Sequence, residues 1–143
     1  MSEINLKILS IDHLENILSL THGLNPNIPI DILKERQQEM FLIENYKCFG
    51  IYDNKELLGV SSGWLTVRLY SGKQLEVDNV IINQNLQSTG IGAKFMILLE
   101  DWAKSNDCET IELNTYVQNS KSHKFYFNQG YDILGFHFQK HLK

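Results

Sequence analysis

The feature that most restricts the fold of this sequence is a short turn with two glycines, QSTGIGA at residues 87–93. The run before it, residues 75–82, is strand-like, and the run after it, residues 93–104, has the apolar spacing of a helix. The first amides of a helix lack partners within the helix and carry the positive end of its dipole. Glycine also allows a ligand close to the main chain. The sequence therefore predicts a strand–turn–helix unit that binds phosphate.

Two familiar nucleotide-binding motifs do not fit this turn. A Walker loop requires Gly-Lys-Ser/Thr after the second glycine, whereas Ala93-Lys94-Phe95 follows here. A dinucleotide fingerprint requires a third small residue where Phe95 stands, and it opens an early βαβ unit. The plain alternative is a helix that needs small residues to pack against a strand.

The size and charge of the chain exclude several classes of protein. Its 143 residues suit one domain, and 43% apolar with 21% charged residues is typical of a globular protein. A net charge of -4 leaves no basic surplus for nucleic acid or anionic membranes. Cys48 and Cys108 form no CxxC pair and are expected to be free thiols. Because neither a signal peptide at residues 1–5 nor a spanning apolar run is visible, we expect a cytoplasmic protein.

The periodicity of apolar residues predicts the order β-α-α-β-β-β-α-β-α-β, with a further strand left open at the end. The predicted strands are residues 4–9, 47–52, 56–69, 75–82 and 109–117, with a last arm or two short strands at 131–141. The predicted helices are residues 11–20, 31–45, 93–104 and 119–129. We expect a single α/β (α+β) domain over residues 1–143, with a central mixed, mostly antiparallel sheet of six to seven strands flanked by about four helices.

Two motifs in this order resemble the GNAT superfamily of N-acetyltransferases. Gln87, Gly90 and Gly92 match its (Arg/Gln)-x-x-Gly-x-(Gly/Ala) signature. Residues 119–131, NSKSHKFYFNQGY, are similar to its Asn-x-x-Ala-x-x-Phe-Tyr-x-x-x-Gly-Phe/Tyr segment, with Ser122 in the place of alanine. The resemblance implies a GNAT-like fold, acetyl-CoA as the acyl-donor co-substrate and no metal.

The resemblance also implies how acetyl-CoA is held. The amides of the turn would bind its pyrophosphate, and the main chain of the preceding strand would pair with its pantetheine arm, with one N–H on the thioester carbonyl. Relatives often carry Arg and Lys in this loop, but residues 83–93 contain neither, so binding would depend on backbone dipoles. The residues assigned to the cofactor are Val80, Ile82, Gln87, Ser88, Thr89, Gly90, Ile91, Gly92, Ala93, Asn119, Ser122 and Tyr126.

Tyr126 matches the general acid of the family. A phenol has a pKa of roughly 10 and an alkyl thiol one of roughly 8.5, so a site poor in water can reverse this small gap and protonate the leaving thiolate. The alternative is a core aromatic beside Phe125 and Phe127. Asn119 can also serve as a helix N-cap, and His123 is expected to be a surface or packing residue rather than a base.

Glu76 and Asp78 are the candidate bases, because an alkylammonium is only about 0.1% neutral at pH 7. Alternation along residues 75–82 places both carboxylates on one face with Val80 and Ile82. The alternative is a solvated rim pair. A β-bulge in this strand would exchange the faces and could turn Asn79 toward the substrate.

The acceptor is expected to be a primary amine of a small molecule or peptide, acetylated by direct transfer in a ternary complex. An acidic site suits a cationic amine, and neither cysteine lies in a motif for a covalent intermediate. The resemblance places specificity at Trp64, Arg68, Tyr70 and Tyr116. Each has a structural alternative, such as core packing for Trp64 and a solvated charge for Arg68. A non-catalytic acyl-CoA-binding sensor or partner module is the second hypothesis, and a homodimer is left open.

Overall fold

The computed structural model describes residues 3–143, and the chain forms two compact units, Met1–Glu112 and Leu113–Lys143. The single domain over residues 1–143 stays a prediction, and its first two residues lie outside the described part. The strands are β1 (Ile4–Leu9), β2 (Tyr46–Asp53), β3 (Glu56–Arg68), β4 (Gly72–Ile82) and β5 (Thr110–Leu113). The helices are α1 (Leu14–Leu24), α2 (Ile30–Phe41), α3 (Ile91–Ser105) and α4 (Ser120–Asn128), with short 3-10 turns η1 (Ile11–His13) and η2 (Gln84–Leu86).

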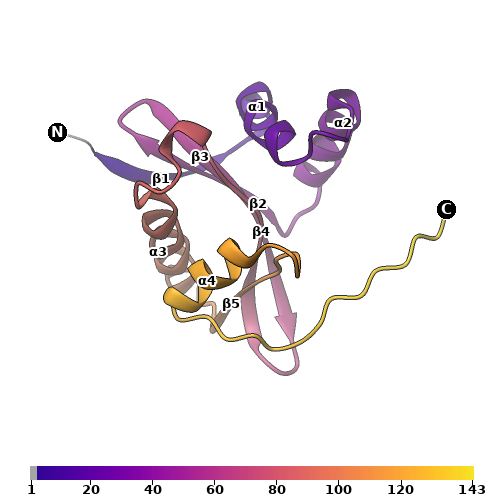
Figure 1. Cartoon of the computed structure of the whole chain (residues 1–143), viewed down its shortest axis with the longest axis vertical. Coiled ribbons are helices and arrows are strands. Elements are labelled where there is room, and N and C mark those ends of the chain that lie inside the picture. The colour runs from indigo at the N-terminus through magenta and orange to yellow at the C-terminus, as the bar shows by residue number, and fades with distance from the viewer. Residues whose placement is uncertain (1–2) are drawn as a thin grey trace. The chain divides into compact units, whose positions relative to one another are not determined.

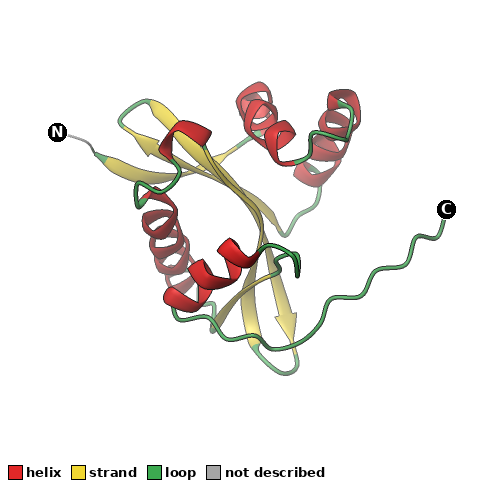
Figure 2. Ribbon diagram, viewed as in Figure 1, coloured by secondary structure: helices red, strands yellow, loops and turns green. Residues whose placement is uncertain are grey.

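Within residues 3–143 the strands form one sheet in the order β1-β2-β3-β4-β5 (Figure 2). The first four strands are antiparallel neighbours. The beginnings of β4 and β5 are joined, because the Glu109 amide donates to the Lys73 carbonyl at 2.7 Å and the Thr110 hydroxyl to the Ser71 carbonyl at 3.4 Å. Both strands therefore start at the same end of the sheet, which confirms the predicted mixed and mostly antiparallel sheet.

The predicted number of strands is wrong. Five strands are present in the described chain rather than six to seven, because residues 131–143 form neither a helix nor a strand. The alternation of apolar residues there does favour a strand, but a strand also needs a neighbour for its ladder of hydrogen bonds. Ile133, Phe136 and Phe138 are instead largely exposed.

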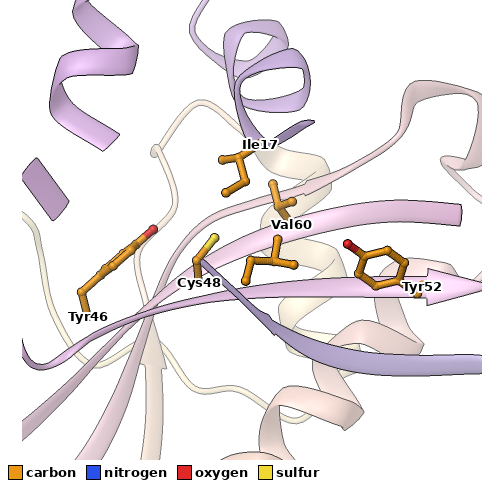
Figure 3. Packing of buried hydrophobic residues seen from close by; sticks show 6 residues of the cluster. Ile17, Tyr46, Cys48, Tyr52 and Val60 are labelled. Atoms are coloured by element: carbon orange, nitrogen blue, oxygen red, sulfur yellow. The ribbon is translucent and has the colours of Figure 1, made fainter. Parts of the chain in front are cut away.

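In the first unit, helices cover both faces of the sheet (Figure 1). On one face α3 buries Phe95 and Leu99, and its Trp102 meets Phe49 of β2 edge to face at 4.8 Å between ring centroids. On the other face, Ile17 of α1 belongs to a cluster with Cys48 (Figure 3). Phe49 and Cys48 are neighbours on β2, so their side chains point to opposite faces of the sheet.

Capping residues mark the ends of the helical segments, and the N-cap expected at Asn119 is present. Ser10 accepts a hydrogen bond from the Asp12 amide at the start of η1, and Asn119 caps α4 by accepting one from the Ser122 amide at 3.2 Å. Gly130, with φ of 91°, follows the end of α4 in the left-handed conformation that glycine favours. Across residues 3–143 none of the helices is both long and apolar enough to cross a bilayer.

Candidate functional site

The glycine turn leads from β4 into the N-terminus of α3. Ser88 and Gly90 have φ values of 67° and 89°, and Gly90 is the N-cap of the helix. A Cβ at Gly90 would meet nothing within 4 Å, so the positive φ rather than crowding accounts for glycine there. The amide of Lys94 donates the first helical bond, to the Gly90 carbonyl at 3.1 Å. The amides of residues 91–93 precede that bond, at an end of the helix suited to an anion.

The side chains of this turn leave the main chain accessible. Residues 87–90 are exposed, and both the amide and the hydroxyl of Thr89 donate to the Leu86 carbonyl. Thr89 thus stabilises the turn, while its hydroxyl oxygen can still accept a hydrogen bond. Lys94 is exposed in the first turn of α3 and is the first basic residue after the loop. The sequence analysis used Lys94 only to reject a Walker motif, although its charge lies close to the end of the helix.

β4 carries a β-bulge immediately before the turn. Ser62 pairs with Asp78 and Val60 with Ile81, so Asn79 and Val80 together lie opposite the single residue between them on β3. Asn79 has a φ of 52°, in the left-handed region that few residues other than glycine adopt. Bulges of this kind redirect the side chains that follow them.

Because of the bulge, one prediction about which side chains share a face of β4 is wrong. Glu76 and Asp78 do share a face, but Val80 and Ile82 do not continue it, because one extra residue shifts the alternation by one position. Ile81 takes the place on the face of Asp78 instead. The Asn79 side chain does not act independently of Asp78, since its amide donates to the Asp78 carboxylate at 3.0 Å.

Asp78 is an accessible carboxylate in a desolvating environment. Its side chain reaches solvent, yet enough protein surrounds it that burial raises the pKa of its carboxyl. The backbone amide of Asn79 opposes this rise by hydrogen bonding to the charged form, and the negative charge of Glu76 adds to it. A carboxylate that binds a proton more readily than usual and remains accessible is suited to general base chemistry.

Glu76 has partners that Asp78 lacks. Its Oε1 accepts hydrogen bonds from Arg68 Nη2 at 2.7 Å and from Gln74 Nε2 at 2.9 Å. Gln74 is fully buried and accepts a bond from the Ser71 hydroxyl at 2.5 Å. The ion pair with Glu76 raises the pKa of Arg68. The charge of Glu76 is therefore balanced, whereas Asp78 makes no ion pair with any residue of the described part, 3–143.

A buried polar group lies beside these carboxylates on the same face. Ser62 is opposite Asp78, and its Oγ lies 2.7 Å from the Tyr46 hydroxyl. That hydroxyl also accepts a bond from Gln37 Nε2 of α2 at 2.8 Å. Burial raises the pKa of Tyr46, so its phenol stays protonated. The sequence analysis missed this group, for which the only signal was a set of polar residues within otherwise apolar elements.

Trp64 and Tyr70, predicted to contact the acceptor, both have structural roles. Trp64 lies opposite Glu76, and its ring packs 4.7 Å from that of Tyr46 at the edge of the core cluster. The Tyr70 hydroxyl is 2.8 Å from both carboxylate oxygens of Glu112, which ties the β3–β4 hairpin to β5. This contact raises the pKa of Tyr70. Their contact with an acceptor stays a prediction.

The second unit contains the other motif. Tyr126 of α4 is half-buried between Phe125 and Tyr131, with ring centroids 5.1 and 5.7 Å away. Burial raises the pKa of the Tyr126 phenol. His123 Nε2 lies 2.9 Å from the Tyr116 carbonyl and must donate to it, because a carbonyl only accepts. His123 thus holds the loop before α4, as a packing residue would. The side chain of Tyr116 is exposed.

An open hollow of about 330 Å³ lies elsewhere in the first unit, between β1, β2 and α2. It is lined by Ile8, Leu9, Ser10, Ile11, Phe41, Tyr46, Lys47 and Cys48. Burial raises the pKa of the Cys48 thiol to about 11, so this cysteine is a poor nucleophile at neutral pH. The hollow thus offers neither a carboxylate nor a reactive thiol for acyl transfer.

Comparison with known proteins identifies the family. Residues 12–131 match the model of the acetyltransferase (GNAT) family. The chain belongs to this family. The match includes both motifs, and it confirms the family predicted from them.

The individual relatives differ in their sequence identity to this chain and in how much of each chain the match covers. An aminoalkylphosphonate N-acetyltransferase of Salmonella typhimurium strain LT2 is 26% identical over 90 residues, which span 62% of this chain but only 58% of that protein. An aminoglycoside N-acetyltransferase solved with CoA has a TM-score of 0.84 at 15% identity, over 100% of this chain and 97% of that one. A transcriptional regulator from Bacillus halodurans C-125 reaches 0.80 at 18% identity, over 98% and 100%. Identities this low show a shared fold alone for the two structures.

Proposed function

We propose that this GNAT protein is an acetyl-CoA-dependent N-acetyltransferase that moves an acetyl group to a primary amine of a small molecule or peptide. The observation that carries the proposal is the sequence of features along β4 and α3. An accessible carboxylate, a bulge and an open helix N-terminus follow one another within residues 78–93. The bulge and the turn offer main-chain donors for acetyl-CoA, and the carboxylate offers a base for the amine.

The part of the site that binds the acyl donor acetyl-CoA, called the donor half, consists of main-chain groups. The amides of Ser88 and of residues 90–93 bind the pyrophosphate through the dipole of α3, whereas the Thr89 amide is already bonded to the Leu86 carbonyl. Where the bulge interrupts the ladder, the amide of Val80 donates to the thioester carbonyl and stabilises the oxyanion that forms there. Lys94 adds a positive charge that the loop itself lacks. This arrangement supports binding of acetyl-CoA without a basic residue inside the loop.

The chemistry proceeds by direct transfer in a ternary complex. Asp78, directly or through a water, takes a proton from the acceptor ammonium, and the free amine attacks the thioester carbonyl. The C–S bond then breaks, and the departing thiolate takes the phenolic proton of Tyr126. Burial supports the role of Asp78, because it raises the pKa of the Asp78 carboxyl toward that of the amine. Burial also raises the pKa of the Tyr126 phenol, so proton transfer to the thiolate requires that the thiolate is poorly solvated as well.

The charges on the acceptor face favour a cationic amine. Arg68 balances Glu76, so the ionised Asp78 leaves a net charge of about minus one, which a single ammonium group would neutralise. Relatives named for aminoalkylphosphonates and aminoglycosides act on small amines, in agreement with this class.

A cytoplasmic location accords with the two free thiols.

The decisive experiment is a screen of amines with acetyl-CoA that follows release of free thiol. We expect turnover with at least one class of cationic primary amine. Binding of acetyl-CoA without thiol release across a broad panel would instead favour a non-catalytic sensor or partner module. Absence of CoA binding would reject both hypotheses.

A further inference from the structure

The ion pair of Glu76 and Arg68 is held in a fixed orientation beside Asp78. Both hydrogen bonds to Glu76 go to Oε1, from Arg68 Nη2 at 2.7 Å and from Gln74 Nε2 at 2.9 Å. Gln74 is fully buried, and its own oxygen accepts from the Ser71 hydroxyl, so its amide cannot turn over without losing both bonds. The Glu76 carboxylate is therefore oriented by a buried group rather than left to rotate in solvent.

This pair keeps hydrogen-bonding atoms available to a ligand. Within residues 3–143 the second oxygen of Glu76, Oε2, has no hydrogen-bond partner, and of the Arg68 guanidinium only Nη2 makes a contact. The side chains of Arg68 and Glu76 are 45% and 34% exposed, so the pair is accessible from solvent. A carboxylate oxygen accepts hydrogen bonds, and guanidinium N–H groups donate them. The pair thus suits a ligand group that donates and accepts at once.

The charges of the pair select among such groups. A second ammonium on the ligand would meet the Arg68 guanidinium, and an acid would meet the Glu76 carboxylate, so each would be repelled by one member. The field of Glu112 also acts on Arg68, but both oxygens of that carboxylate contact the Tyr70 hydroxyl at 2.8 Å. A hydroxyl is neutral and can donate and accept. The pair therefore favours a hydroxyl over a second charged group.

The register of β4 sets the distance between this pair and the proposed base. Glu76 and Asp78 are two residues apart on one face of the strand, and the bulge begins only after Asp78. Two residues of a regular strand advance about 7 Å. An extended chain advances about 1.2 Å per bond, so a hydroxyl at Glu76 would be about five or six bonds from an amine nitrogen at Asp78.

We propose that the acceptor is an amino alcohol, in which a primary amine meets Asp78 and a hydroxyl about five or six bonds away meets Glu76 Oε2 and the Arg68 guanidinium. This inference rests on the proposed acetyl transfer and names the class of amine that it uses. The hydroxyl is remote from the reacting carbonyl, so its contacts lower KM and leave kcat unchanged. Gln74 is a positioning residue, because it orients Glu76 without touching the acceptor.

The test ranks four five-carbon amines as competitive inhibitors of an amine that the thiol-release screen finds to be accepted. The compounds are 5-amino-1-pentanol, pentylamine, 1,5-diaminopentane and 5-aminopentanoate, which differ in the group at the far end of the chain. We expect the amino alcohol to inhibit about three- to tenfold more strongly than pentylamine, the range that one net hydrogen bond allows. The diamine and the amino acid should inhibit less strongly than the amino alcohol.

Two matched variants test the role of Glu76. Glu76→Met keeps the length of the side chain but removes its hydrogen-bonding oxygens, and should erase the advantage of the amino alcohol over pentylamine. Glu56→Met makes the same exchange at an exposed position at the start of β3, and should leave the ranking unchanged. Circular dichroism verifies that each variant is folded.

The outcomes separate this inference from the proposed function. Absence of thiol release with every amine of the screen would reject acetyl transfer itself. If an amine is turned over, equal or absent inhibition by the amino alcohol and pentylamine would overturn the inference and leave acetyl transfer standing. Stronger inhibition by the amino acid, or by the diamine beyond the gain from its two equivalent amines, would do the same. An advantage of the amino alcohol that survives Glu76→Met would also overturn it.

Discussion

The most discriminating prediction about the site is that Asp78, and not Glu76, acts as the general base. Glu76 is engaged by Arg68 and Gln74, whereas Asp78 is accessible and its carboxyl has a raised pKa. We therefore expect Asp78→Asn to remove the general base. We expect Glu76→Gln to remove only an ion pair beside it. The two substitutions are matched, because each replaces a carboxylate by its amide on the same face of β4.

The expected magnitudes follow from these different roles. A positioned general base contributes about 10²–10⁴ in rate, so Asp78→Asn should lower kcat/KM at neutral pH at least about 100-fold. Loss of an exposed ion pair costs little, so Glu76→Gln should lower it by less than about tenfold. The deficit of Asp78→Asn should shrink as the pH approaches the pKa of the acceptor amine, about 10.4, since the amine then loses its proton without help.

The assay is thiol release from acetyl-CoA with one accepted amine, measured from pH 6 to pH 10 for the wild type and both variants. Calorimetric binding of CoA serves as a control and should be unchanged in both, because neither side chain belongs to the donor half. Equal losses in the two variants, or a deficit of Asp78→Asn that does not depend on pH, would refute the assignment of the base.

Four further predictions concern single residues. Tyr126→Phe should lower kcat at least about tenfold with unchanged CoA affinity, as measured by steady-state kinetics and calorimetry. Gly92→Val should weaken CoA binding by crowding the helix N-terminus, with little effect on the melting temperature; unchanged affinity would exclude the turn. Tyr46→Phe should lower the free energy of unfolding by about 1–3 kcal/mol in urea titrations, because two buried partners lose a hydrogen bond. Asp78→Asn should raise the melting temperature at pH 7 but not below about pH 3.9, where both side chains are neutral.

The sign of the last prediction follows from linkage. A carboxyl whose pKa is raised by folding is penalised when it is ionised, so the folded state loses stability as the pH rises through that pKa. Asparagine cannot ionise and avoids this loss at neutral pH. An equal melting temperature at pH 7 would mean that Asp78 is as well solvated in the fold as in the unfolded chain.

Much of the fold could be predicted because it is encoded locally. The strand–turn–helix unit follows from apolar spacing around Gly90, and the start of α4 follows from the capping preference of Asn119. Both features depend on residues that are close in the sequence. The family motifs combine the same local signals, which is why they could be recognised.

What could not be predicted depends on contacts between distant residues. The sequence analysis could raise a bulge in β4 only as an alternative. Asp78 and Asn79 are adjacent polar residues that interrupt the alternation, but such a pair does not by itself show where the hydrogen-bond ladder takes in an extra residue. The pairing of Arg68 with Glu76 depends on the β3–β4 register. The C-terminal segment was expected to join the sheet, since alternation predicts a strand whether or not a neighbour is available.

The bulge in β4 has a consequence for which substitutions and deletions this protein tolerates. Substitutions at Asn79 or Val80 alter one side chain, but deletion of either residue would restore an uninterrupted ladder. Ile81 and Ile82 would keep their present faces, because Ile81 already lies on the face of Asp78, but the main-chain donors that the bulge leaves for acetyl-CoA would be paired within the ladder. The length of this strand is therefore under stricter constraint than its composition, and gaps in sequences of close relatives should avoid it.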